Sequence, residues 1–168
     1  MKYKLVKISK FSGNEASVYT LLIENEQGKF EESLFDIFIN ENKTLYLSEI
    51  KNIFSRLKTI GNDTGARESF FKTNEGVPGD GVCALYDSPS KKLRLYCIRY
   101  GKELIVLGGG GPKNVKALQD DKKLKKENYF LRWLSKKITE CIRNNDILFS
   151  NDFMDFEGDL IIKDDYEN

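Results

Sequence analysis

Three consecutive segments that read as β-strands constrain the fold more than any other feature of the sequence. Residues 81–87, 92–100 and 102–107 are separated only by the short turn sequences Asp87-Ser88-Pro89-Ser90 and Tyr100-Gly101-Lys102. Such turns join antiparallel neighbours. The third segment is almost entirely apolar after its first two residues, as expected for a central strand buried on both faces. We therefore predict an antiparallel sheet at the centre of the protein.

The N-terminal quarter of the chain also has the composition of strands. Residues 2–9, 16–24 and 29–40 are rich in β-branched and aromatic residues, and polar, glycine-containing sequences separate them. This pattern predicts a β-meander over residues 1–42.

Helical patterns follow this meander and the central strands. Apolar residues at helical spacing predict a helix that starts near Tyr46 and ends at Gly61, and a shorter helix over residues 62–74. A long amphipathic helix is predicted over about residues 120–144, and a strand over residues 147–150. The fold class is thus α+β, with an antiparallel sheet packed by two N-terminal-side helices and one long C-terminal helix. We expect one core to contain Leu93, Leu95, Cys97, Leu104, Val106, Phe130, Leu134 and Ile138.

We interpret residues 1–168 as one domain with three parts, and charge is distributed unevenly among these parts. The meander, residues 1–42, has five basic and seven acidic side chains, whereas the α+β core, residues 43–148, has 21 basic and 12 acidic ones. The acidic tail, residues 149–168, has one basic and seven acidic side chains. The core is thus a candidate surface for anions or nucleic acid, although lysines that only solvate helices would give the same composition. We expect the acidic tail to lie against or near this basic region.

Composition excludes several kinds of site. The chain has no histidine, which excludes every mechanism that uses imidazole as an acid, base or zinc ligand. The three cysteines fit no zinc or CxxC spacing and are expected to be buried thiols. We expect no metal and no cofactor. No apolar run is long enough to cross a bilayer, and the first residues alternate charged and apolar side chains, unlike a signal peptide. A cytoplasmic protein without a membrane partner is expected.

The strand at residues 92–100 carries the strongest functional signal. Its odd-numbered residues begin with apolar side chains and predict a core face. The even-numbered residues form the opposite face: Arg94, Tyr96, Ile98 and Tyr100. An arginine with two tyrosines on one face can bind phosphate and stack on bases, although an ordinary solvent-facing strand would show the same alternation. Further positive charge is close in sequence: Lys91, Lys92, Arg99, Lys102, Lys113 and Lys116.

Two other segments have a weaker resemblance to binding motifs. Residues 108–111 are four glycines, but Lys113 is not followed by the serine or threonine of a phosphate-binding loop. We predict a flexible exit from the central strand that delivers Lys113 to the end of the sheet. The acidic residues between 152 and 159 lack the spacing of a calcium loop and are interpreted as part of an amphipathic segment.

The order of two helices, three antiparallel strands and a glycine exit with a basic residue resembles the RelE/ParE/HigB-type toxins of bacterial toxin–antitoxin modules. The resemblance covers about residues 45–120 and rests on residues 82–86, 93–98, 104–108 and 111–113. This chain is extended beyond that pattern by the meander, the length of the last helix and the acidic tail.

The resemblance implies a RelE-like core and a toxin that acts as an endoribonuclease on mRNA without a metal. It places Arg94 at the catalytic arginine and Lys113 at the basic position after the last strand, with Tyr96 as a stacking or proton-transfer residue. Nucleic-acid binding would involve Lys91, Lys92, Tyr100, Lys102 and Lys116. RNA or the ribosome, and an antitoxin protein, would be the partners. The alternatives are a non-catalytic protein of the same fold that binds a protein or nucleic acid, and a domain whose basic region is only solvated surface.

Overall fold

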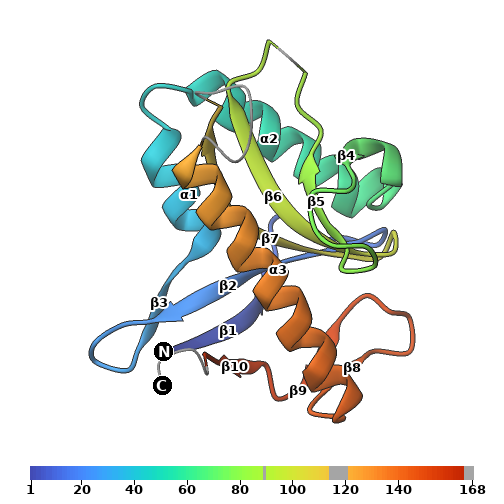
Figure 1. Ribbon diagram of the computed structural model, residues 1–168. Coiled ribbons are helices and arrows are strands. Elements are labelled where there is room, and N and C mark those ends of the chain that lie inside the picture. Colours follow the sequence, from blue (N-terminus) through green and yellow to red (C-terminus); the bar gives the residue numbers. More distant parts are fainter. Residues whose placement is uncertain (89, 114–120, 165–168) are drawn as a thin grey trace.

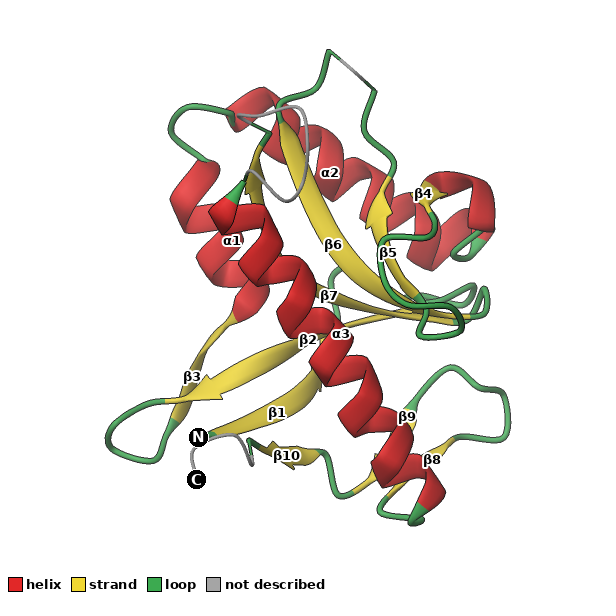
Figure 2. Cartoon of the chain, viewed as in Figure 1, coloured by secondary structure: helices red, strands yellow, loops and turns green. Residues whose placement is uncertain are grey.

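The computed structural model describes residues 1–88, 90–113 and 121–164. Within these residues it has three α-helices and ten strands (Figures 1 and 2). The helices are α1 (Leu34–Asn42), α2 (Leu47–Thr59) and α3 (Lys122–Arg143). The strands are β1 (Lys2–Lys7), β2 (Ser17–Glu24), β3 (Phe30–Ser33), β4 (Phe71–Lys72), β5 (Val82–Leu85), β6 (Leu93–Tyr100), β7 (Leu104–Pro112), β8 (Ile147–Phe149), β9 (Phe156–Gly158) and β10 (Ile161–Lys163).

One large, mostly antiparallel sheet organises the protein, and its strand order is β10-β1-β2-β7-β6-β5-β4. β3 pairs with β2 beside this path, and β8 and β9 form a separate two-stranded sheet. The single parallel pairing in the large sheet joins β2 to β7, where Val18 lies opposite Ile105. Figure 1 shows α3 crossing one face of the sheet. The predicted α+β class is therefore confirmed, with three helices of which the last is long.

The segment predicted as a strand over residues 29–40 divides into β3 and helix α1. Ser33 begins the helix with a capping box: its hydroxyl accepts from the Asp36 amide, and the Asp36 carboxylate accepts from the Ser33 amide. Phe35, Phe38 and Asn42 then lie on the buried side of the helix. The strand prediction was wrong after Ser33. The aromatic residues of this segment are compatible with a strand or a helix, and the capping box favours the helix.

The second helix region also differs from its prediction. α2 is confirmed, but it does not end at a left-handed Gly61. The chain continues through a π-helical turn, Ile60–Thr64, and leaves it at Gly65, whose φ is 76°. The separate helix predicted over residues 62–74 does not form: residues 62–64 complete the π-helical turn, and the described residues after it form a 3₁₀ turn, Glu68–Phe70, and β4.

Two hydrophobic cores lie on the two faces of the sheet, so the prediction of one shared core was wrong. Leu93, Leu95 and Cys97 belong to the core beneath α1 and α2. The second core lies beneath α3 and contains the other predicted residues: Leu104, Val106, Leu134 and Ile138, with Phe130 packed at its edge. A strand buried on both faces supplies both cores, because its side chains alternate between them.

The four glycines are part of β7 and not a flexible exit from it. Leu95 of β6 lies opposite Gly110, while Cys97 lies opposite Leu107, so the register shifts at Tyr96. This irregularity brings the two backbones close together. A methyl group on Gly110 would collide with the carbonyl oxygen of Arg94, whereas one on Gly111 would make ordinary contacts with the side chains of Lys123 and Leu124, the shortest at 3.4 Å to the Lys123 Cγ.

The neighbouring glycines give a matched pair for testing this close approach. Gly110→Ala is expected to lower the free energy of unfolding by about 1–3 kcal/mol or more, because paired backbones can relieve the collision only by moving apart. Gly111→Ala is expected to change it by no more than about 0.5 kcal/mol. Urea unfolding of both variants measures the difference, and equal stabilities would show that the register shift is wrong.

The acidic tail adds the edge strand β10 to the sheet, next to β1. β10 pairs antiparallel with β1, where Ile162 lies opposite Tyr3. Asp155 forms an ion pair with Lys7 at 2.9 Å and accepts a hydrogen bond from the Tyr19 hydroxyl. The tail also contacts residues 43–148, since Phe149 and Phe156 pack against the Tyr100 ring, so part of it lies against the central region as expected. That it shields the basic side chains there stays a prediction. Among the described helices, none is both long and apolar enough to cross a membrane.

Candidate functional site

Four residues from neighbouring strands meet at one end of the sheet. Asp87 follows β5, and only 4% of its side chain is exposed. Lys72, the last residue of β4, contacts its Oδ1 atom at 2.6 Å. Its Oδ2 atom is contacted by Arg94 of β6 (Nη2, 3.4 Å) and by Lys113, directly after β7 (Nζ, 2.6 Å). We call these four residues the Asp87 cluster.

The Asp87 cluster carries an excess of positive charge. Burial alone raises the pKa of Asp87, but its contacts with Lys113 and Lys72 and the charge of Arg94 outweigh burial and hold the pKa below its usual value. The carboxylate is therefore ionised at neutral pH, and three cations face one anion. The cations are only partly accessible, with 18% of the side chain exposed in Arg94 and in Lys113. A second anion, such as a phosphate, would be attracted to this end of the sheet.

Tyr96 lies beside the Arg94 guanidinium on the same face of β6 but has no exposed surface. Burial raises the pKa of its phenol to about 12, which the neighbouring Arg94 charge opposes only in part. The phenol therefore stays protonated at neutral pH. Its hydroxyl and the Nε atom of Arg94 are both buried, and the phenol oxygen interacts with the Arg94 guanidinium. Tyr96 thus helps to position Arg94 beside the cluster.

Two predicted binding residues lie far from the cluster along β6. Tyr100 is at the other end of this strand, where its ring packs against Phe149 and Phe156 with centroids 5.8 and 5.5 Å apart. Lys102 is exposed in the turn beyond it. The structure therefore brings together Arg94, Lys113 and Tyr96, and separates Tyr100 and Lys102 from them.

The remaining predicted residues lie at the start of β6. Lys92 is exposed and Lys91 is partly buried, and the amide of Lys92 donates to the Glu49 carboxylate at 2.8 Å. Both add positive charge near the cluster. Lys116 lies outside the described residues.

The expected basic and aromatic sheet face is covered, which corrects the prediction of an open binding surface there. Tyr96 and Ile98 have no exposed surface and belong to the core beneath α3. Neither can stack on a base in this structure. Arg94 and Lys113, by contrast, each keep 18% of the side chain accessible at the end of the sheet.

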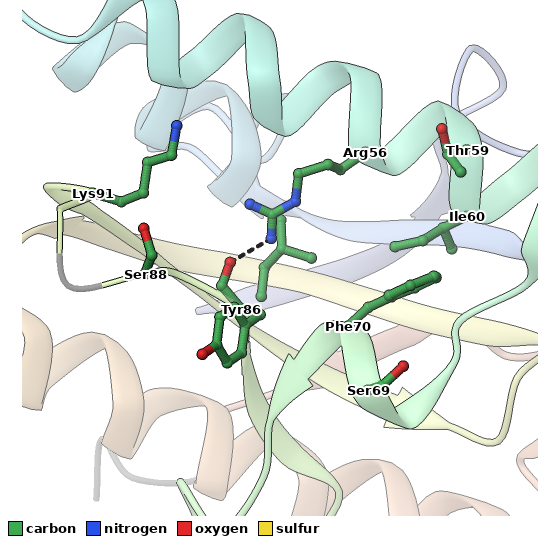
Figure 3. Close-up of a pocket in the computed structure, with 9 residues that line it drawn as sticks. Arg56, Thr59, Ile60, Ser69, Phe70, Tyr86, Ser88 and Lys91 are labelled. Atoms are coloured by element: carbon green, nitrogen blue, oxygen red, sulfur yellow. Dashed lines mark hydrogen bonds between the residues drawn. The ribbon is translucent and has the colours of Figure 1, made fainter.

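A pocket of about 380 Å³ lies beside this end of the sheet, between α2 and the edge strands (Figure 3). Arg56 reaches from α2 and donates through Nη2 to the carbonyl oxygen of Tyr86, at 2.5 Å. Phe70 and Ile60 line the apolar part of the pocket, and Lys91 lies at its other end. We call it the Arg56 pocket.

Asp87 and Arg56 were not predicted as site residues. Asp87 stands in a turn sequence, where aspartate is common for local reasons. The available signal was its position: a lone acidic residue directly after an apolar strand, within a strongly basic region. Arg56 falls on the polar side of an amphipathic helix, so the sequence contains no signal that distinguishes it from a solvated lysine.

Residues that could ligate a metal are dispersed. Among the described residues, no group of three or more cysteine, aspartate or glutamate side chains is placed to hold an ion. Cys83 and Cys97 are buried free thiols, while Cys141 is partly exposed. Comparisons with family models, curated proteins and solved structures found no match for this chain.

Proposed function

We propose that this protein is a toxin-like endoribonuclease that binds an RNA phosphodiester at the Asp87 cluster and cleaves it without a metal. The observation that supports the proposal is the meeting of Arg94 and Lys113 at one carboxylate oxygen of a buried aspartate. Residues 19 positions apart in the sequence thereby present two cations to one small volume. Lys72 adds a third charge on the other oxygen.

Such a cluster can stabilise the transition state of RNA cleavage. The 2′-oxygen forms a bond to phosphorus, the bond from phosphorus to the 5′-oxygen breaks, and the 2′-hydroxyl proton is transferred to the leaving oxygen. Negative charge develops on the phosphoryl oxygens during this step. Arg94 and Lys113 would offset it, since preorganised donors aimed at developing charge are a main source of catalysis.

The other polar groups of the site have supporting roles in this proposal. Asp87 is a positioning residue: it holds the cations together, and its lowered pKa makes it a weak base. The Tyr96 phenol, protonated at a pKa of about 12, would donate a hydrogen bond and would not accept a proton.

The order of elements supports the proposal in part. α2 precedes the antiparallel strands β5, β6 and β7, and Lys113 follows the last of them, as in the order on which the resemblance to RelE/ParE/HigB-type toxins rests. The second helix of that order, expected over residues 62–74, is replaced by a 3₁₀ turn and β4. We accordingly propose mRNA, in the cytoplasm and on the ribosome, as the substrate, and an antitoxin protein as the partner.

A non-catalytic binding module of the same fold is the second candidate, and one observation favours it. Arg94 already has an anionic partner in Asp87, and Tyr96 is covered by the core beneath α3. Residues held in this way can bind a phosphate or an acidic protein surface without supporting a reaction.

Inducible expression with a growth readout separates the two candidates. The ribonuclease is expected to arrest growth and, when purified, to convert ribosome-bound mRNA to fragments that end in a 2′,3′-cyclic phosphate. The binding module is expected to bind RNA or protein and leave the RNA intact. Normal growth together with intact RNA would reject the ribonuclease.

A further inference from the structure

The Arg56 pocket contains a cation without an anionic partner. Within the part of the chain that the structure describes, its guanidinium makes hydrogen bonds only to neutral oxygens, the carbonyl of Tyr86 and, at 3.5 Å, the side chain of Asn52. No carboxylate of the described residues forms an ion pair with it. Burial lowers the pKa of Arg56, and the more distant Asp87 carboxylate opposes this less strongly. A partly desolvated cation at an apolar cavity gains most from an anion that enters the cavity.

The walls of this pocket suit a flat apolar group next to that anion. Ile60, Phe70 and Leu85 form an apolar surface, and the Tyr86 ring, 51% exposed, is at its edge. Aromatic side chains of this kind bind bases by stacking. The volume of about 380 Å³ is in the range of small-ligand sites, so a nucleotide-sized group fits.

The pocket is also connected to the Asp87 cluster. Lys72, which contacts Asp87, lies with its Nζ atom 5.7 Å from the centre of the Tyr86 ring. On the other side, Lys113 donates to the carbonyl oxygen of Ser88, a residue that lines the pocket, at 3.3 Å. A chain of phosphates could therefore pass from one site to the next.

We propose that the Arg56 pocket is a nucleotide subsite. It takes one nucleotide of an RNA chain, with the base against Phe70 and Tyr86 and the phosphate at Arg56 and Lys91, while a neighbouring phosphate lies at the Asp87 cluster. The identification of RNA rests on the proposed function. The pocket itself is defined by its own residues.

Affinity for a mononucleotide tests the pocket directly. Calorimetry with adenosine 3′-monophosphate and with inorganic phosphate is carried out on the full chain and on three variants. Arg56→Gln and Ser69→Trp, which fills the mouth of the pocket, are expected to weaken nucleotide binding by about 10- to 100-fold, the loss of one charge-assisted contact or of the stacking space. Lys58→Gln is the matched control, because Lys58 is an exposed cation two residues away on the same helix. It should bind as the wild type does.

The base must contribute to affinity, so the nucleotide is expected to bind at least about 10-fold more tightly than phosphate, as one stacked base provides. Equal affinities for the two ligands would overturn the proposal, and so would Arg56→Gln binding as Lys58→Gln does. Circular dichroism and thermal unfolding confirm that each variant is folded.

A non-cleavable 2′-O-methyl tetranucleotide separates this inference from the proposed function. It is expected to bind more tightly than the mononucleotide, and both Arg56→Gln and Lys113→Gln should weaken it. If the mononucleotide binds at Arg56 but the tetranucleotide binds no more tightly, RNA is rejected as the ligand, and the assignment of the pocket as a nucleotide site is retained. If RNA cleavage depends on Arg94 but not on Arg56, the Arg56 pocket is rejected as a subsite, and the proposed ribonuclease function is retained.

Discussion

Replacing Asp87 with alanine is expected to lower the free energy of unfolding by about 3–5 kcal/mol, the usual cost of removing one partner from a buried ion pair. Three cations would then face one another with no anion between them. Lys72 is the most exposed of the three, with 29% of its side chain accessible, and Arg94 and Lys113 are more deeply placed.

An exposed ion pair provides the matched control for this loss. Glu41 and Lys123 lie 3.2 Å apart, with 47% and 42% of their side chains exposed. Glu41→Ala is expected to cost no more than about 1 kcal/mol, because solvent screens such pairs. Urea unfolding at pH 7 measures both variants. Equal losses for Asp87→Ala and Glu41→Ala would show that the cluster is not a buried ion-pair network.

A second substitution tests the physical reason. In the wild type, Lys72→Met removes a favourable contact and should destabilise the fold. In the Asp87→Ala background the same change removes a repelling charge, so it should restore part of the stability. A change of sign between the two backgrounds identifies the electrostatic coupling, and the same sign in both would attribute the loss to packing.

The dependence of stability on pH follows from the lowered pKa of Asp87. A carboxyl group whose pKa is lower in the folded protein contributes stability above its unfolded pKa of about 3.9 and loses that contribution as the pH falls through the folded value. The stability difference between wild type and Asp87→Asn should thus be fully present at pH 7 and shrink below about pH 4. A difference that stays constant down to pH 2 would contradict the assignment.

The sequence predicts the elements of this protein better than it predicts which surfaces are open. The hydrophobic pattern extends over 8 residues in β6 and over 22 residues in α3. Patterns of this length are enough to distinguish a strand from a helix. The alternation of side chains along a strand correctly predicts that Arg94 and Tyr96 lie on one face of β6. Whether that face meets water depends on where α3 packs, and local sequence does not contain this information.

The Asp87 cluster and α1 illustrate two further limits. The cluster depends on the register of four strands, so its members become neighbours only when the whole sheet is formed. α1 depends on a single cap: the aromatic residues after Ser33 suit a strand or a helix, and one hydroxyl decides between them. The glycine run was misread because glycine is usual in flexible loops, while here it permits the close pairing of β6 and β7.

Arg94→Ala is expected to reduce the rate of RNA cleavage by about 10²–10³, the usual effect of losing one preorganised donor to developing charge. Growth arrest on expression should be relieved accordingly. The fold should survive this change, because Asp87 keeps both lysine contacts at 2.6 Å. Lys113→Ala is expected to weaken cleavage in the same direction, since it removes the second charge at the same oxygen.

Two further variants show whether the effect of Arg94 is catalytic or structural. Arg99 lies on the same strand and donates through Nε to the carbonyl of Ala66 at 2.7 Å, away from the cluster. Arg99→Ala should therefore leave the cleavage rate unchanged. Arg94→Lys keeps the charge but not the planar fork of donors, so it should recover only part of the rate. Single-turnover cleavage with saturating protein measures the chemical step apart from RNA binding. If Arg94→Ala weakens RNA binding but no variant changes that step, the charges at Asp87 serve recognition, and the protein is the binding module.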